Sequence, residues 1–245
     1  MTNLENRFLR KVGAVSSLVY GLGWMLGGIC SLAGDKMILS AIHSPATGHV
    51  EAGANLALAW WLEVFANVVF AFSDFGIIIA FAAFGILYRS ACPIYRILCF
   101  TIAVWMTISV GVDTFLAGAS WQYGLVGNGT DPERIAAVWQ SYLANVINIL
   151  RFPVGGMYLF LGCAMFLLGW LLGRNAWARG LRVVAFVFGA VLIVEAGIEV
   201  AAVLFVRRPI PSIFAIPLFI LNLIVVAPWF GIRFARSFRG IEAPE

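Results

Sequence analysis

The stretch that decides the fold is residues 57–88, ALAWWLEVFANVVFAFSDFGIIIAFAAFGILY, which is almost wholly apolar yet contains Glu63 and Asp74. It exceeds the roughly 20 apolar residues that one membrane crossing needs, so it predicts a transmembrane helix. A carboxylate at the centre of such a helix costs about 2.5–3.5 kcal/mol or more to insert. The two acids are therefore the first pointers to a functional site.

The rest of the chain has the same character. Of its 245 residues, 62% are hydrophobic and only 11% are charged, whereas soluble domains are about a quarter charged. Outside the apolar runs, no segment reaches the roughly 50 residues that a soluble domain needs. The sequence therefore predicts an all-α, polytopic helix bundle that forms one membrane domain over residues 1–245.

Six apolar runs are long enough to cross a lipid bilayer. They cover about residues 12–34, 57–88, 94–119, 143–173, 183–206 and 212–232. Six crossings place eleven basic residues on one side and four on the other, and basic residues favour the cytoplasmic side. The eleven are Arg7, Arg10, Lys11, Arg89, Arg96, Arg174, Arg179, Arg182, Arg233, Arg236 and Arg239. We therefore expect both termini to lie in the cytoplasm.

A shorter helix is predicted on the outer side, over about residues 132–142. Asp131 precedes Pro132, which is the arrangement of an N-cap residue followed by proline at the first helical position. Apolar side chains then recur at helical spacing, at Ile135, Val138, Trp139 and Tyr142. We expect an amphipathic helix that leads into the fourth crossing.

Five of the twelve acidic residues fall inside the predicted crossings, in the outer half or near the midplane. They are Glu63, Asp74, Asp113, Glu195 and Glu199. Polar side chains in a membrane bundle face inward or line water, so one acidic pocket open to the outside is the simplest arrangement. Glu195 and Glu199 share a helix face, where two negative charges repel. A bound cation or a proton is needed to offset them.

Neighbouring polar residues complete the predicted site. Asn67 lies on the same helical stripe as Glu63 and Asp74. Arg151 is the only basic residue placed to enter the outer half from a helix, and one arginine cannot neutralise five acids. A solvated, interfacial Glu63 and a purely structural pair of Asp113 with Arg151 stay open as alternatives. The residues predicted to bind a ligand or cation are Asp74, Glu195, Glu199, Asp113, Arg151, Asn67 and Asn148.

Other candidates for chemistry are weaker. His43, His49 and Glu51 supply three metal-ligating groups in the first outer loop, but their spacing fits no dedicated motif and a solvated loop is the simpler interpretation. No nucleotide-binding, metalloprotease or nucleophile motif occurs, so the sequence does not favour an enzyme and names no cofactor. The basic residues lie at helix ends rather than on a soluble face, which argues against nucleic acid.

Several short motifs follow one another along the chain. The second apolar run ends in Phe84-Gly85-Ile86-Leu87-Tyr88-Arg89, and Tyr95-Arg96 opens the third. Gly162 through Gly173 precede a basic turn, and Ile216-Pro217-Leu218 lies near the start of the last run. In this order of features the chain resembles a broad group of small bacterial six-helix membrane proteins of unknown function. The resemblance implies a multi-pass protein of the bacterial inner membrane and supplies no activity.

Three classes of function fit these features. The first is binding or transport of a cation, a proton or a small amine in the outer-facing acidic pocket. The second is an accessory subunit of a larger membrane complex, which the small size and the lack of a catalytic motif would suit. The third is an intramembrane lipid-modifying enzyme that uses paired carboxylates as acid and base. Other membrane proteins or further copies of the chain stay open as partners.

Overall fold

The fold is all-α, as the apolar runs predict. The computed structural model describes residues 3–43, 49–88, 93–127, 131–173, 178–204, 217–218 and 220–240. Within these ranges the backbone is almost entirely helical and contains no strand. Five of the helices are long and apolar enough to cross a membrane, so the protein is consistent with a multi-pass membrane protein.

Several of the helices are longer than the apolar runs from which they were predicted. Their bounds are α1 (Asn3–His43), α2 (His49–Leu87), α3 (Pro93–Gly127), α4 (Pro132–Tyr142), α5 (Asn148–Leu171), α6 (Arg179–Leu204) and α8 (Ala227–Gly240). Two π-helical segments, η1 (Leu143–Ile147) and η3 (Asn222–Val226), precede α5 and α8. α4, η1 and α5 follow one another without a break, and α4 occupies the residues of the predicted outer helix.

The helix at the predicted last crossing also differs from its predicted bounds. The apolar run ends at residue 232, whereas α8 continues to Gly240. The apolar run ends at the first arginine, but the helix continues past it. The terminal segment is amphipathic, so one of its faces can still pack against the bundle. Phe230, Phe234 and Phe238 recur every four residues and are at most 1% exposed.

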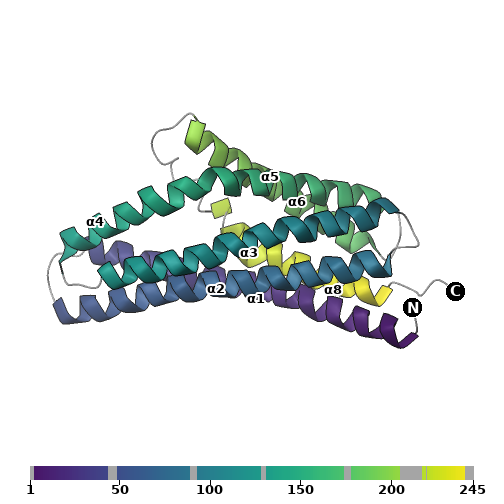
Figure 1. Ribbon diagram of the computed structural model, residues 1–245, viewed down its shortest axis with the longest axis horizontal. Helices are drawn as coiled ribbons and strands as arrows, with labels where there is room; N and C mark the ends of the chain where they lie inside the picture. The colour runs from purple at the N-terminus through teal and green to yellow at the C-terminus, as the bar shows by residue number, and fades with distance from the viewer. Residues whose placement is uncertain are drawn as a thin grey trace.

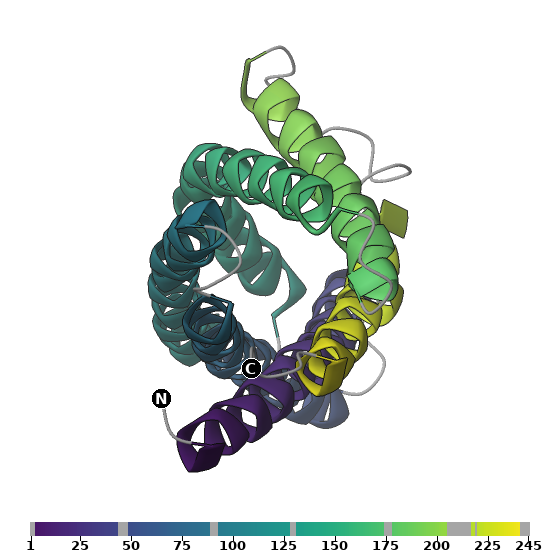
Figure 2. The same ribbon diagram turned by 90° about the vertical axis from the view of Figure 1, so that its right-hand side faces the viewer.

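The long helices form a closed ring in chain order. α1 packs extensively against α2 and α8, α2 against α3, and α5 against α6. The two remaining junctions, α3 with α5 and α6 with η3–α8, are much smaller. Figure 2 is a view along the long axis of the bundle, and it shows the hairpin of α5 and α6 closing one side of the ring. The start of α1 and the end of α8 lie at the same end of the bundle, and α4 lies at the other end (Figure 1).

Glycines allow α1 to approach its neighbours closely. A Cβ atom at Gly27 would come within 2.7 Å of the Phe70 ring of α2, and one at Gly28 within 2.6 Å of Leu223 in η3. Gly34 meets Glu63 in the same way. Two glycine faces on one helix thus serve contacts inside the chain, since small residues are what membrane helices use for close packing.

The outer surface of the ring is apolar. Phe72, Ile97, Val104 and Trp170 are between 66% and 70% exposed, whereas Tyr20, Phe81 and Phe84 are at most 1% exposed. Soluble proteins rarely present large contiguous apolar surfaces to water. Exposed apolar side chains along helices of this length fit a surface that faces lipid acyl chains.

Candidate functional site

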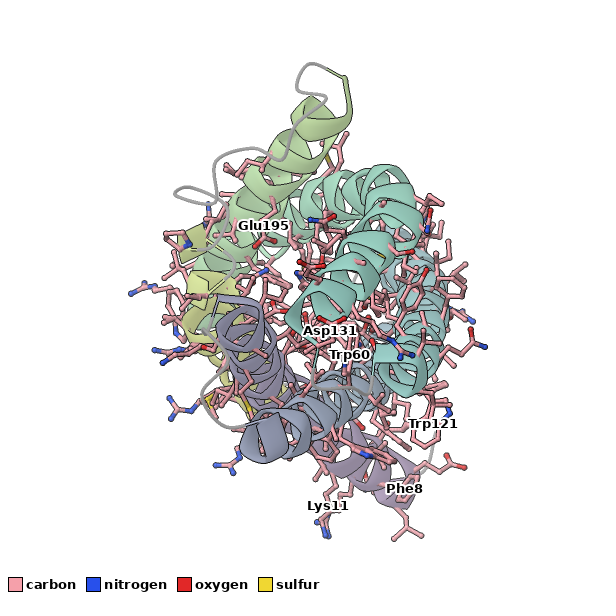
Figure 3. The ribbon with its side chains drawn as sticks, turned by 90° about the vertical axis from the view of Figure 1, so that its left-hand side faces the viewer. Phe8, Lys11, Trp60, Trp121, Asp131 and Glu195 are labelled. Carbon is pink, nitrogen blue, oxygen red and sulfur yellow. The ribbon has the colours of Figure 1, made fainter. Side chains whose placement is uncertain are left out.

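A cavity of about 330 Å³ lies among α1, α2, α3, α5 and the α4–η1 segment. Three carboxyl groups line it, from Asp35, Glu63 and Asp113, together with the amide of Asn67. Five aromatic side chains also line it: Trp24, Phe70, Trp139, Tyr142 and Tyr158. Among the described residues no basic side chain lines this cavity. The chain therefore presents an acidic, aromatic-walled site at the end of the bundle where α4 lies; Figure 3 views the molecule from that end.

Glu63 is the most enclosed acid of the cavity wall. The residue is 6% exposed, and the Ser31 hydroxyl of α1 donates a 3.2 Å hydrogen bond to its Oε2. Oε1 is buried and has no hydrogen-bond partner among the described residues. The absent side chain of Gly34 makes room for this carboxyl, since a Cβ there would lie 2.7 Å from Oε1. Glu63 is thus buried rather than solvated at an interface.

Asp74 lies directly behind the cavity wall. It is 0% exposed, and the indole Nε1 of Trp24 donates a 2.7 Å hydrogen bond to its Oδ1. Trp24 itself lines the cavity and packs on Phe70, with ring centroids 5.1 Å apart. Trp24 therefore separates Asp74 from the cavity and at the same time fixes its carboxyl group.

Asp113 of α3 connects the cavity to Asp74. The two carboxyl groups interact with each other, and the Ser109 hydroxyl lies beside Asp74. In each carboxyl group, Oδ2 is buried without a hydrogen-bond partner among the described residues. Two ionised carboxylates 4 Å apart repel by about 4 kcal/mol at an effective dielectric constant of 20. A shared proton or a nearby cation is therefore needed to hold them together.

Glu195 lies on the opposite side of the ring. Its carboxylate accepts a 2.9 Å hydrogen bond from Nδ2 of Asn222, which joins α6 to the first residue of η3. Both residues are buried, at 8% and 1% exposure, and Figure 3 shows where Glu195 lies on α6. Glu195 does not line the cavity. Among the described residues, Glu195 therefore belongs to a polar contact at the α6–η3 junction rather than to the cavity wall.

Aromatic rings close the cavity at the α4 end. Trp60 packs edge-on against Trp139 and Tyr142, with centroids 5.8 Å and 5.6 Å away. The hydroxyl groups of Ser120 and Tyr142 lie 3.1 Å apart and share a hydrogen bond. Asp131 caps α4 because its side chain accepts from the backbone N–H of Glu133. This cap and the ring contacts hold the segment that forms the cavity roof.

Both π-helical segments occur next to these polar groups. Leu143 and Ile147 of η1 line the cavity, and η3 begins at Asn222, the partner of Glu195. π-helical turns are rare in proteins, and those that do occur often lie at functional sites. Periodicity along the sequence gives no signal for them.

The structure describes only some of the predicted site residues. Asp113 and Asn67 line the cavity, Asp74 adjoins it and Glu195 is elsewhere. The side chains of the others lie outside the described residues: Asn148, Arg151, Glu199, His43, His49 and Glu51. Asp35 lines the cavity but was not predicted. The signal available in the sequence was its position four residues after Ser31, which places both residues on one face if the helix continues beyond the apolar run.

A metal centre has no support in the described part of the chain. There, no group of three or more His, Cys, Asp or Glu side chains is arranged to hold a metal ion. The acids instead interact in two pairs, Asp35 with Glu63 and Asp74 with Asp113.

Comparison with known proteins adds no assignment. No protein-family model, no curated protein and no solved structure matches the chain significantly.

Proposed function

We propose that this protein is a six-span membrane protein, with both termini cytoplasmic, that binds a small organic cation in the cavity from the outer side. The observation that carries the proposal is the set of three carboxyl groups, Asp35, Glu63 and Asp113, in one cavity that no described basic side chain lines. A bound cation would offset their charge, which nothing described in the cavity wall does.

The lining favours an organic cation over a bare metal ion. Trp24, Trp139 and Tyr142 present aromatic rings to the same space as the acids, and aromatic faces attract ammonium groups within about 6 Å. A volume of about 330 Å³ is at the lower end of the range for small-ligand pockets. A compact amine or quaternary ammonium ion fits both the size and the chemistry.

The orientation follows from the basic residues. Eleven of them gather on the side of the termini in a six-span arrangement, which favours the cytoplasm for that side. The cavity lies toward the α4 end of the bundle, opposite the start of α1 and the end of α8 (Figure 1). A ligand would therefore enter from outside the cell, as in binding for uptake or sensing.

The test uses the purified full-length chain in detergent and three cations: choline, tetramethylammonium and guanidinium. The control ligand is 3,3-dimethylbutan-1-ol, which has the shape of choline without its charge. We expect at least one cation to raise the melting temperature at constant ionic strength while the neutral analogue does not.

A matched pair of variants locates the binding. Glu63→Gln removes a buried cavity charge, whereas Glu133→Gln removes an exposed charge on α4. We expect Glu63→Gln to weaken cation binding roughly tenfold or more and Glu133→Gln to leave it unchanged. If no cation binds, or if Glu63→Gln binds as the wild type does, the proposal is wrong.

A further inference from the structure

The carboxyl pair of Asp74 and Asp113 is asymmetric. Asp74 is 0% exposed and accepts a hydrogen bond from Trp24, while Asp113 lines the cavity. Only Asp113 is therefore in contact with the space that a ligand would occupy.

The pair lacks a hydrogen-bond donor between its members. Oδ2 of Asp74 and Oδ2 of Asp113 are both buried without a partner among the described residues. Ionised carboxylates only accept hydrogen bonds, whereas a protonated carboxyl also donates one. One proton on the pair supplies the missing donor and removes one of the two negative charges.

The surroundings determine which member carries that proton. The Trp24 N–H points at Asp74, and the Ser109 hydroxyl lies beside it. Donors directed at a carboxylate favour its charged form. The negative charge therefore belongs on Asp74 and the proton on Asp113.

No described basic side chain lies beside the pair to offset its charge in place of the proton. The titratable groups that interact with the pair or line the same cavity come from α1, α2, α4 and α5, and all are acids or phenols. They are Tyr20, Asp35, Glu63, Tyr142 and Tyr158, and Tyr20 also interacts with Glu195 of α6. The side chain of Arg151 lies outside the described residues.

We propose that the cavity exchanges a proton for its cationic ligand, and that Asp113, held by Asp74, carries the exchanged proton. This inference rests on the proposed function. When the cation enters, the O–H bond of Asp113 breaks, the proton leaves to water through the cavity, and the carboxylate faces the cation. One positive charge enters and one leaves, so the net charge of the site does not change.

The experiment counts protons released on choline binding. Choline has no titratable proton, so every proton released comes from the protein. Calorimetric titrations in two buffers of different ionisation enthalpy give the number released per bound choline. Near neutral pH we expect about one for the wild type and for Glu133→Gln. Asp74→Asn should bind choline but release few protons, because the new amide supplies the donor that the pair lacks.

A second measurement does not depend on the stability of Asp74→Asn. Infrared difference spectra should show the loss of a protonated carboxyl C=O band when choline binds to the wild type. The same band change should be absent in Asp113→Asn.

The outcomes separate this inference from the proposed function. If choline binds without proton release, or if both Asp variants release as many protons as the wild type, the inference is wrong and the binding function stands. If none of the three cations binds, the proposed function fails and the exchange with it.

Discussion

The indole of Trp24 on α1 and the carboxyl group of Asp74 on α2 are joined by a 2.7 Å hydrogen bond across the most extensive helix contact of the bundle. The same indole ring forms part of the cavity wall. A single side chain thus connects helix packing, the charge on a fully buried acid and the shape of the candidate site.

Trp24→Phe keeps much of the ring packing but removes this donor. A buried acceptor that loses its partner costs about 1–3 kcal/mol, so we expect a clearly lower melting temperature in detergent. Trp61→Phe is the control, because Trp61 is 54% exposed and its replacement should change little. Equal melting temperatures for the two variants would contradict a stabilising role for the bond.

Gly34→Ala should damage both packing and binding. The new Cβ would lie 2.7 Å from Oε1 of Glu63 and 2.9 Å from the Ala59 carbonyl oxygen, and overpacking typically costs about 1–3 kcal/mol. Gly111→Ala is the control, since nothing lies within 4 Å of its Cβ position. That change should be neutral or stabilising because alanine favours helix by about 1 kcal/mol. Thermal unfolding of both variants, with and without choline, measures the difference.

Asn222→Asp should make the stability of the protein depend more strongly on pH. The Nδ2 donor to Glu195 is lost and a second carboxyl takes its place, so repulsion grows as the pH rises and both groups ionise. We expect the melting temperature of the variant to fall with rising pH more steeply than that of the wild type. Adding Glu195→Gln restores an amide–carboxylate pair and should recover much of the loss. No recovery in the double variant would argue against a direct interaction.

Asp131→Ala should loosen α4 locally. The Asp131 side chain caps the helix through the Glu133 N–H, and losing an N-cap costs about 0.5–2 kcal/mol. We expect faster hydrogen–deuterium exchange in the first turns of α4, with exchange in α2 unchanged. Uniformly faster exchange in both helices would instead indicate global destabilisation.

Tyr142, outside the membrane-spanning segments, should titrate late. Burial raises the pKa of its phenol from the ordinary value of 10.0 to about 12. The neutral form is favoured by the folded state, so the stabilising contribution is complete below pH 10 and is lost as the pH rises toward about 12. The difference between the tyrosinate absorbance titrations of the wild type and Tyr142→Phe should give this late transition. A transition near pH 10 would show that the phenol is accessible to water.

The helical fold was predictable because apolar composition and run length have few structural solutions in a membrane. The ends of the helices were less predictable than the fold. The apolar run of α1 stops before Asp35 and Lys36, yet the helix continues to His43. Charged residues end a hydropathy run without ending a helix whose backbone hydrogen bonds continue.

The full set of site residues could not be predicted from residue spacing, because spacing along one helix does not show how that helix is rotated relative to the others. Glu63 and Asn67 were predicted to share one face of α2, and both line the cavity. Whether α2 and α6 turn their acids toward the same space is a matter of helix rotation within the ring. Asp74 and Glu195 consequently looked alike in sequence, although one adjoins the cavity and the other contacts Asn222.

The π turn of η1 has a consequence for how the cavity roof tolerates changes in chain length. A π turn contains one more residue than an α turn, and each residue rotates a helix by about 100°. The π turn takes up this extra residue without turning the helices on either side of it, so deleting one residue from Leu143–Ile147 should leave an ordinary α-helix with α4 in the same rotation. Deleting a second residue would rotate α4 relative to α5 by about that angle. Trp139 and Tyr142 would then face away from the acids with neither residue replaced. The aromatic roof over the carboxyl groups should thus tolerate the loss of one residue but not of two.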